Sequence, residues 1–198
     1  MMKFVVASNN AKKLAEMCEI FSEIGVSVIS LRDAGIVSEP EETGATFEEN
    51  AFVKARAAML ASGLPAIADD SGLCVSALDE APGVYSARYG GDGLSDEDRV
   101  QLLLRQLGDE SIRDAKFVCA VACVFTDGSE FALQGECAGE ITKTPRGSEG
   151  FGYDPVFLPE GLDNTMAELM PPEKNKISHR GKALRMLKKE LERRYVDK

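Results

Sequence analysis

The sequence lacks several features that would mark particular classes of protein. Basic residues are fewer than acidic ones, 23 against 33, and the net charge is −10, whereas a protein that binds duplex nucleic acid normally carries a basic face. No apolar run approaches the ~20 residues that cross a bilayer. The opening residues, MMKFVVASNN, hold too short an apolar run for a signal peptide. We therefore expect a soluble, cytoplasmic protein that binds neither polymeric nucleic acid nor membranes.

The residues that build common metal and cofactor sites are equally sparse. The chain has one histidine, His179, and its five cysteines include no CxxC pair. Because most cysteines lie in apolar runs and their number is odd, we interpret them as reduced core residues. Cys119 and Cys123 share a face of a predicted strand, but no nearby ligands complete a zinc set. The absence of GxxxxGK[ST] and GxGxxG excludes a P-loop or Rossmann site.

The hydrophobic pattern predicts the fold class. With 198 residues, 44% of them hydrophobic, the chain can bury one sizeable core, and we expect residues 1–198 to form a single domain. Periodicity predicts a first helix with Leu14, Met17, Cys18 and Phe21 on one stripe, and helices over 46–62, 95–107 and 179–194. It predicts strands over 3–7, 26–31, 66–70, 115–126, 131–142 and 156–158, a second extended piece over 74–78, and a hairpin turn at Asp127-Gly128. This order indicates an α/β fold with a mixed, strongly twisted sheet, helices on both sides, and two lobes around a central substrate cleft.

The segment AIADDSGL, residues 66–73, is the most informative part of the chain. A buried strand that runs into two carboxylates, Asp69 and Asp70, is a poor core segment, because unpaired buried charge is costly. Adjacent strand residues point to opposite faces, so the two carboxylates cannot share one role. The alternative is a polar turn after the strand, where Asp, Ser and Gly are common.

Cations stand at two predicted helix starts, where the helix dipole disfavours them. Lys12 and Lys13 follow a strand-to-helix turn that begins at Ser8, and backbone N–H groups at such a turn suit an anion. His179 and Arg180 begin the last helix after Ser178, a predicted N-cap. The alternatives are an ordinary cap at the first start and two solvated surface residues at the second.

Several other charged and aromatic residues also suggest a site for an anionic ligand. Lys54 shares a helix face with Asn50, and Lys174 lies in a predicted basic turn over 171–176. Glu42 precedes a helix, and Phe151 lies in a glycine-rich loop close to Asp154. Cations with helix starts indicate phosphates, carboxylates beside phosphates indicate Mg²⁺, and the aromatic ring indicates a stacked base. Together they predict a nucleotide with a polyphosphate tail and a metal.

These residues carry a resemblance to a known family. The chain resembles the inosine triphosphate pyrophosphatase family in SNNAKK, ETGATFEENAFVKA, ADDSGL, PGVYSARY, GFGYDPVF and SHRGKAL, which follow one another over nearly its whole length. The resemblance implies Mg²⁺-dependent hydrolysis of deaminated purine nucleoside triphosphates (XTP, ITP and dITP) to the monophosphate and pyrophosphate. It also implies a homodimer and a role in keeping deaminated purines out of DNA and RNA.

The resemblance also implies roles for individual residues. Asp70 would be the catalytic proton acceptor and, with Glu42, a magnesium ligand, while Asp69 would be a supporting or structural group. Phe151 would stack on the base. The residues implied in substrate binding are Ser8, Asn9, Asn10, Ala11, Lys12, Lys13, Lys54, Ser71, Phe151, Gly152, Tyr153, Asp154, Lys174, His179 and Arg180.

Selectivity for deaminated purines has a simple physical basis. Hypoxanthine and xanthine present a 6-oxo acceptor where adenine presents a 6-amino donor. Donors from Arg180 or His179 at that position would be left unpaired by adenine. GTP, which is also 6-oxo, is not rejected by this account.

Two rival functions remain at this point. The first is a related pyrophosphatase acting on modified pyrimidines or 7-methyl-GTP, against which the SHR segment (residues 178–180) argues. The second is a nucleotide-binding regulator without catalysis, which would not need both Glu42 and Asp70.

Overall fold

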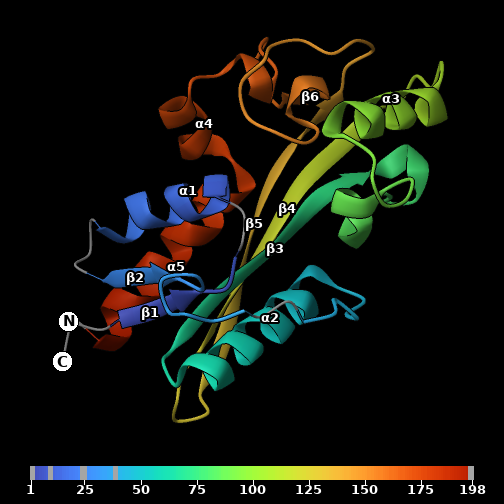
Figure 1. Ribbon diagram of the computed structural model, residues 1–198. Coiled ribbons are helices and arrows are strands. Elements are labelled where there is room, and N and C mark those ends of the chain that lie inside the picture. Colours follow the sequence, from blue (N-terminus) through green and yellow to red (C-terminus); the bar gives the residue numbers. More distant parts are fainter. Residues whose placement is uncertain (1–2, 9–10, 23–25, 38–39, 196–198) are drawn as a thin grey trace. The chain divides into compact units, whose positions relative to one another are not determined.

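The computed structural model describes residues 3–8, 11–22, 26–37 and 40–195 (Figure 1). The chain forms two compact units. Unit 1 contains residues 1–70, 119–135 and 180–198, and unit 2 contains residues 71–118 and 136–179. Among the described residues, no helix combines the length and apolar character needed to span a bilayer.

The elements follow the predicted alternation. The strands are β1 (Lys3–Val6), β2 (Ser27–Ser30), β3 (Ala66–Val75), β4 (Asp114–Val124), β5 (Glu130–Ile141) and β6 (Phe157–Pro159). The α-helices are α1 (Ala11–Ser22), α2 (Phe47–Ser62), α3 (Asp96–Leu107), α4 (Pro171–Ile177) and α5 (His179–Tyr195). Short 3₁₀ turns are η1 (Ser76–Leu78), η2 (Gly83–Arg88), η3 (Asp154–Val156) and η4 (Met166–Glu168).

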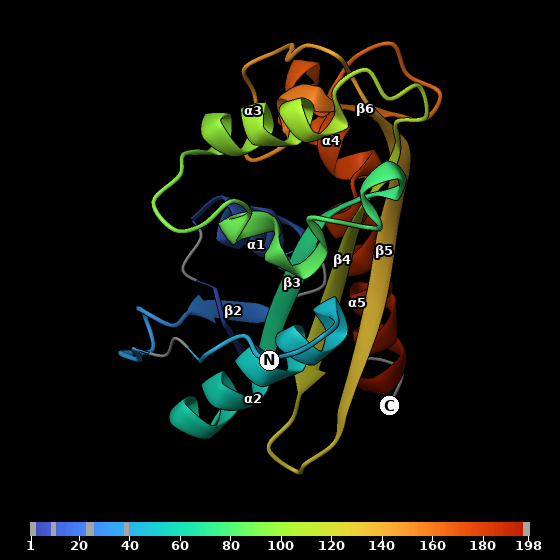
Figure 2. The same cartoon turned by 90° about the vertical axis from the view of Figure 1, so that its right-hand side faces the viewer.

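The strands form one mixed sheet in the order β2-β1-β3-β4-β5-β6. β1 pairs in parallel with both β2 and β3, whereas β5 and β6 are antiparallel. β4 and β5 are joined by the predicted turn at Asp127-Gly128, which Figure 2 shows, and Gly128 has a φ of 85° there. The predicted α/β class with a mixed sheet is therefore confirmed.

In unit 1, helices cover both faces of the sheet. Alternate residues of the strands, such as Phe4, Ile67 and Val121, share a core with α1 and α5. The intervening residues, such as Val5 and Ala68, are also fully buried, and α2 contacts β1. Its buried face consists of the small residues Ala51, Ala55 and Ala58 together with Phe47 and Asn50. The small side chains let the helix axis approach the sheet closely, which matters because two of its polar residues reach β3.

Unit 2 has its own core, which supports a loop of predicted site residues. Val100, Leu103 and Leu107 of α3 pack there against alternate residues of β3, β4 and β5. Tyr153, Val156 and Phe157 join the same core and so fix the segment that follows β5. The Arg113 guanidinium links separate segments of this unit, because it donates hydrogen bonds to the carbonyl oxygens of Gly108, Ile141 and Thr142.

Two predicted boundaries were wrong. β3 does not end at Asp69 and Asp70 but continues to Val75, because cations from neighbouring helices compensate both carboxylates. Residues 171–177 form the helix α4 rather than a basic turn. Proline is tolerated at the first positions of a helix, and the basic Lys174 and Lys176 lie in its last turn, where the dipole favours cations.

The interpretation of the cysteines was correct for four of the five. Cys74, Cys119, Cys123 and Cys137 are buried and free. Burial raises the pKa of the Cys119 and Cys123 thiols to about 12, so neither is a ready thiolate ligand. Cys18 is exposed, whereas its helical neighbours Met17 and Phe21 are buried, so its place on the apolar stripe was wrong.

The alanine face of α2 predicts a strong size limit at Ala55, whose side chain is completely buried. Ala55→Leu should lower the free energy of unfolding by about 1–3 kcal/mol, because extra methylene groups in a packed core force side chains and backbone to shift. The exposed Ala61 of the same helix is the matched control, and Ala61→Leu should change stability by less than ~0.5 kcal/mol. Urea denaturation measures both. An equal effect of the two variants would contradict close packing of α2.

Candidate active site

The two adjacent carboxylates face different partners, as the strand alternation predicts. Asp69 lies on the face of β3 that packs against α1 and α5, and its side chain is 1% exposed. Its Oδ2 atom contacts Lys13 Nζ at 2.9 Å and accepts a hydrogen bond from Arg180 Nε at 3.2 Å. One carboxylate oxygen therefore links the first turn of α1 with the first turn of α5.

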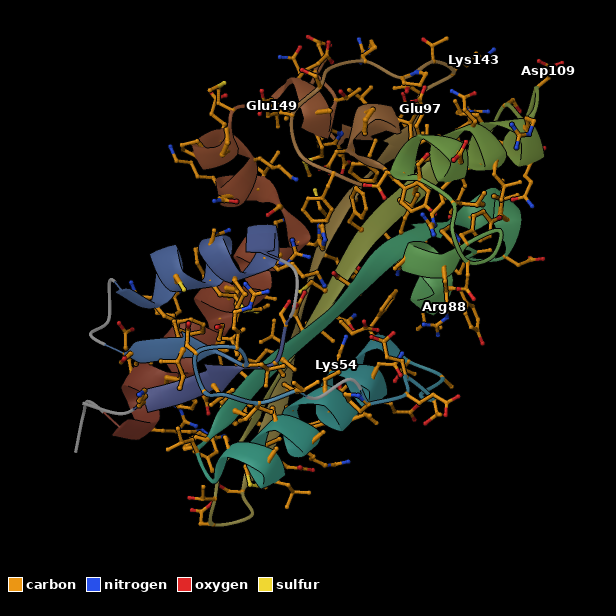
Figure 3. All side chains as sticks on the ribbon, viewed as in Figure 1. Lys54, Arg88, Glu97, Asp109, Lys143 and Glu149 are labelled. Atoms are coloured by element: carbon orange, nitrogen blue, oxygen red, sulfur yellow. The ribbon has the colours of Figure 1, made fainter. Side chains whose placement is uncertain are left out.

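Asp70 points to the opposite face, toward α2. Its Oδ1 accepts a hydrogen bond from Lys54 Nζ at 2.8 Å, and its Oδ2 accepts one from Asn50 Nδ2 at 3.3 Å. Asn50 and Lys54 are one helical turn apart, so a single face of α2 supplies both contacts. Figure 3 shows Lys54 on this helix.

The two carboxylates also differ in electrostatics. Burial alone would raise the pKa of Asp69, but Lys13 and Arg180 outweigh it and hold that pKa well below its usual range. For Asp70, burial is the largest influence and raises the pKa, Lys54 opposes it, and Glu42 adds to the rise. Asp69 is thus held as a permanent anion, whereas Asp70 is the better proton acceptor of the pair.

Glu42 joins the same group from the loop before α2. Its Oε1 lies 3.1 Å from Lys54 Nζ, so Glu42 and Asp70 contact the same ammonium group. The neighbouring Gly44 is tightly enclosed: its N–H donates to Asn50 Oδ1 at 2.8 Å, and an added Cβ would lie 2.7 Å from that oxygen. We call Lys13, Glu42, Asn50, Lys54, Asp69, Asp70 and Arg180 the charged cluster.

The donor set of the charged cluster suits magnesium. Within the described part of the chain, no three His, Cys, Asp or Glu side chains form a ready-made metal cage. Mg²⁺ commonly binds one or two carboxylates and takes its other oxygens from water and substrate phosphates. Glu42 and Asp70, side by side at one cation, match that requirement.

The other predicted phosphate-binding residues lie at or near the start of α1. Ser8 follows β1, and its N–H donates to the carbonyl oxygen of Val6 at 3.0 Å. Lys13 lies in the first turn of α1, as predicted. Ala11 and Lys12 belong to the same turn, but their side chains lie outside the described part, as do the whole of Asn9 and Asn10.

The predicted base-binding residues gather in unit 2 around the Phe151 loop, which we define as residues 150–154. Asp154 and Lys174 are both buried and paired, with Lys174 Nζ 2.6 Å from Asp154 Oδ2. The same oxygen accepts the N–H of Phe151 at 2.8 Å, and Lys174 Nζ lies 5.0 Å from the centre of the Phe151 ring. Gly150 has a φ of +78°, and an added Cβ would meet Asp154 Oδ2 at 2.1 Å. The loop therefore wraps around the Asp154 carboxylate.

Tyr153 anchors the Phe151 loop to the core. Its ring is buried, and its hydroxyl donates to the carbonyl oxygen of Ser86 at 3.0 Å. Ser86 in turn donates to Gly83 and accepts the N–H of Leu73, which ties the loop to η2 and β3. Burial raises the pKa of the Tyr153 phenol, so this side chain stays neutral.

The remaining predicted residues lie on β3 and at the start of α5. Ser71 is half-buried and follows Asp70 on β3. Ser178 immediately precedes α5 in extended backbone (φ −62°, ψ 152°), the position predicted for its cap. His179 is buried and stacks on Phe117, with ring centres 4.7 Å apart and planes 13° apart.

A separate surface hollow in unit 2 does not fit the predicted ligand. It has a volume of about 590 Å³ and contains none of the predicted site residues. Its lining includes Glu80, Asp114, Glu140 and Glu160. Four carboxylates would repel a triphosphate, so the charged cluster is the better phosphate site.

Sequence reasoning assigned no role to two contact residues. Asn50 was noted only for sharing a helix face with Lys54, and that spacing was the available signal. Phe117 lies in the strand predicted over 115–126, and its stacking on His179 depends on a long-range approach that no local pattern reveals.

Comparisons with known proteins show the family of this chain. The Ham1 family profile matches residues 4–190, and the chain belongs to the Ham1 family. A dITP/XTP pyrophosphatase of Gluconobacter oxydans is 50% identical over 182 residues, which cover 92% of this chain and 87% of that protein. A dITP/XTP pyrophosphatase of Aquifex aeolicus is 50% identical over 195 residues, covering 94% and 95%.

Solved structures of the family share the fold. A HAM1 protein from Coxiella burnetii matches with a TM-score of 0.91 and 46% identity, covering 96% of this chain and 98% of that one. The Staphylococcus aureus Ham1 protein matches with a TM-score of 0.88 and 43% identity over the same shares. The family resemblance seen in the sequence motifs is therefore confirmed.

The lowered pKa of Asp69 predicts a pH-dependent stability. A carboxylate whose folded pKa lies below its unfolded value of about 3.9 stabilises the fold above that pH and loses its contribution as pH falls. Asp69→Asn should lower the free energy of unfolding by about 3–5 kcal/mol near pH 7, because the buried Arg180 and the half-buried Lys13 lose their partner.

Denaturant unfolding of the wild type and of Asp69→Asn, from pH 7 down to the acid range, measures the difference in their free energies of unfolding. This difference should become smaller below about pH 4. The control is Asp109→Asn, a change at an exposed residue labelled in Figure 3, which should leave the unfolding midpoint nearly unchanged. A difference that stays constant with pH would contradict the proposed ionic role of Asp69.

Proposed function

We propose that this chain is a nucleoside-triphosphate pyrophosphatase that hydrolyses deaminated purine nucleoside triphosphates (XTP, ITP and dITP) to the monophosphate and pyrophosphate. The observation that carries the proposal is the charged cluster, in which three cations and three carboxylates meet on β3 and its neighbouring helices. The names of the close relatives, dITP/XTP pyrophosphatases, support the same substrate class.

The phosphate chain has suitable partners in the two lysines of the charged cluster. Lys13 and Lys54 are each held by carboxylates, so their ammonium groups are oriented before the substrate binds. The hydroxyl of Ser8 and the backbone N–H groups in the first turn of α1 would contribute further donors, and helix starts favour anions. Pre-organised donors act on the charge that develops at the phosphates without a reorganisation cost.

Magnesium would be bound by Glu42 and Asp70 in this proposal. When bound, Mg²⁺ neutralises phosphate charge and lowers the pKa of an attacking water. Because Lys54 Nζ contacts both carboxylates, the lysine would have to share these oxygens or turn toward the phosphates. Asp70, whose pKa is raised by burial, would take the proton from the water.

The base would stack on Phe151. The paired Lys174 and Asp154 hold the loop that carries this ring, and His179, held by Phe117, supplies a further polar group. Arg180 and His179 remain the proposed donors to the 6-oxo group. The proposed function also includes a homodimer, a cytoplasmic location and removal of deaminated purines from the nucleotide pool.

If Asp70 is the proton acceptor, its replacement should reduce turnover of ITP but leave ITP binding in place. Asp70→Asn should lower kcat for ITP by about 10²–10⁴, the usual contribution of a positioned general base. Binding of ITP, measured by calorimetry, should persist.

Glu42→Gln should raise the Mg²⁺ concentration needed for half-maximal rate, because one carboxylate ligand is lost.

The control for these two changes is Glu41→Gln, at an exposed position beside Glu42, which should behave as the wild type. An active Asp70→Asn enzyme would contradict the role of Asp70. Wild-type protein that binds ITP but releases no pyrophosphate would favour the non-catalytic regulator instead.

Selectivity is tested by the ratio of kcat/KM for ITP to kcat/KM for ATP, which cancels any loss of folded enzyme. Arg180→Ala should lower this ratio by about five- to 150-fold, since an unpaired buried donor costs ~1–3 kcal/mol. Arg180→Lys keeps a positive charge beside Asp69 but lacks the guanidinium fork, and it should also lose selectivity. An unchanged ratio in both variants would remove Arg180 from base recognition.

A further inference from the structure

The backbone on both sides of the Phe151 ring is held by carboxylates. The N–H of Phe151 donates to Asp154 Oδ2 at 2.8 Å, and the N–H of Gly152 donates to Asp96 Oδ2, also at 2.8 Å. Asp154 belongs to the Phe151 loop itself. Asp96, by contrast, is the first residue of α3 and lies 56 positions before Gly152 in the chain.

This long-range contact ties the loop to a rigid element. α3 is fixed by Val100, Leu103 and Leu107, which are buried in the unit 2 core. Gly152 has a φ of +59°, a left-handed conformation that glycine adopts without steric penalty. The turn at Gly152 directs its N–H to the start of this helix, so α3 sets where the loop can lie.

The carboxylate of Asp96 is not used for capping its own helix. Ser95 is the N-cap of α3, and the reciprocal bonds of its capping box are made with Asp98. An acid in the first turn is nonetheless favoured by the helix dipole. Asp96 therefore stabilises the helix start and can give its Oδ2 atom to a distant segment.

We propose that Asp96 is a positioning residue for base recognition: it holds Gly152 and thereby fixes the Phe151 ring against which the purine stacks. This inference rests on the proposed function, which places the base on Phe151. Asp96 does not contact the substrate in this account. Its effect should therefore be confined to binding of the base and absent from binding of the phosphates.

The test measures base and phosphate binding separately. In Asp96→Ala, the dissociation constant for inosine monophosphate, measured by calorimetry, should rise about three- to tenfold, the range for one lost hydrogen bond of ordinary strength at an exposed position. The dissociation constant for Mg²⁺-pyrophosphate should be unchanged. In steady-state assays, KM for ITP should rise by the same factor while kcat falls less than twofold.

Three variants of the same helix turn serve as controls. Asp96→Asn retains an oxygen that can accept the Gly152 N–H, so it should restore most of the affinity for inosine monophosphate. Glu97→Ala changes an exposed acid in the same turn, labelled in Figure 3, and should match the wild type. Asp98→Ala removes the capping box and should lower stability without changing the KM for ITP.

The outcomes separate this inference from the proposed function. An active wild type whose Asp96→Ala variant binds inosine monophosphate normally would overturn the role of Asp96 alone. Equal weakening of inosine monophosphate and pyrophosphate binding would overturn it as well, since the effect would then not be confined to the base. Wild-type protein that neither binds inosine monophosphate nor hydrolyses ITP would overturn the proposed function and this inference with it.

Discussion

The buried ionic contact of Asp69 with Lys13 and Arg180 is the constraint on which the rest of the site depends. A fully buried carboxylate is costly unless it is paired, and here one oxygen takes both partners. The contact fixes the first turns of α1 and α5 at the middle of β3. It also explains why cations stand at helix starts that the dipole would otherwise leave to acids. Together with the contact of Lys54 with Asp70, this charge compensation lets β3 continue through two carboxylates.

The alternation of β3 then separates two tasks between neighbouring residues. Asp69 faces α1 and α5 and orients Lys13, a proposed phosphate ligand, and Arg180, a proposed donor to the base. Asp70 faces α2, where Asn50 and Lys54 hold it, and burial raises its pKa. Because the strand alternation gives these two identical side chains different neighbours, their electrostatics differ: Lys13 and Arg180 outweigh burial and lower the pKa of Asp69, whereas burial raises the pKa of Asp70.

The sequence predicted this arrangement only in part. Periodicity located most strands and helices, and the alternation rule correctly placed Asp69 and Asp70 on opposite faces. The continuation of β3 could not be predicted, because the compensating charges come from Lys13 and Arg180, which are distant in the chain. The helix α4 was missed because its two prolines suggested a turn. Contacts such as Asp96 with Gly152 depend on tertiary approach and leave no local signal.

The central claim is that the charged cluster directs water to the bond between the α- and β-phosphates of a purine triphosphate. Phosphorus NMR of the products formed from ITP with Mg²⁺ tests this most directly, because it identifies which bond is broken. The account predicts inosine monophosphate and pyrophosphate in equal amounts, with ATP left intact over the same time. Formation of inosine diphosphate and phosphate, or no reaction at all, would contradict it.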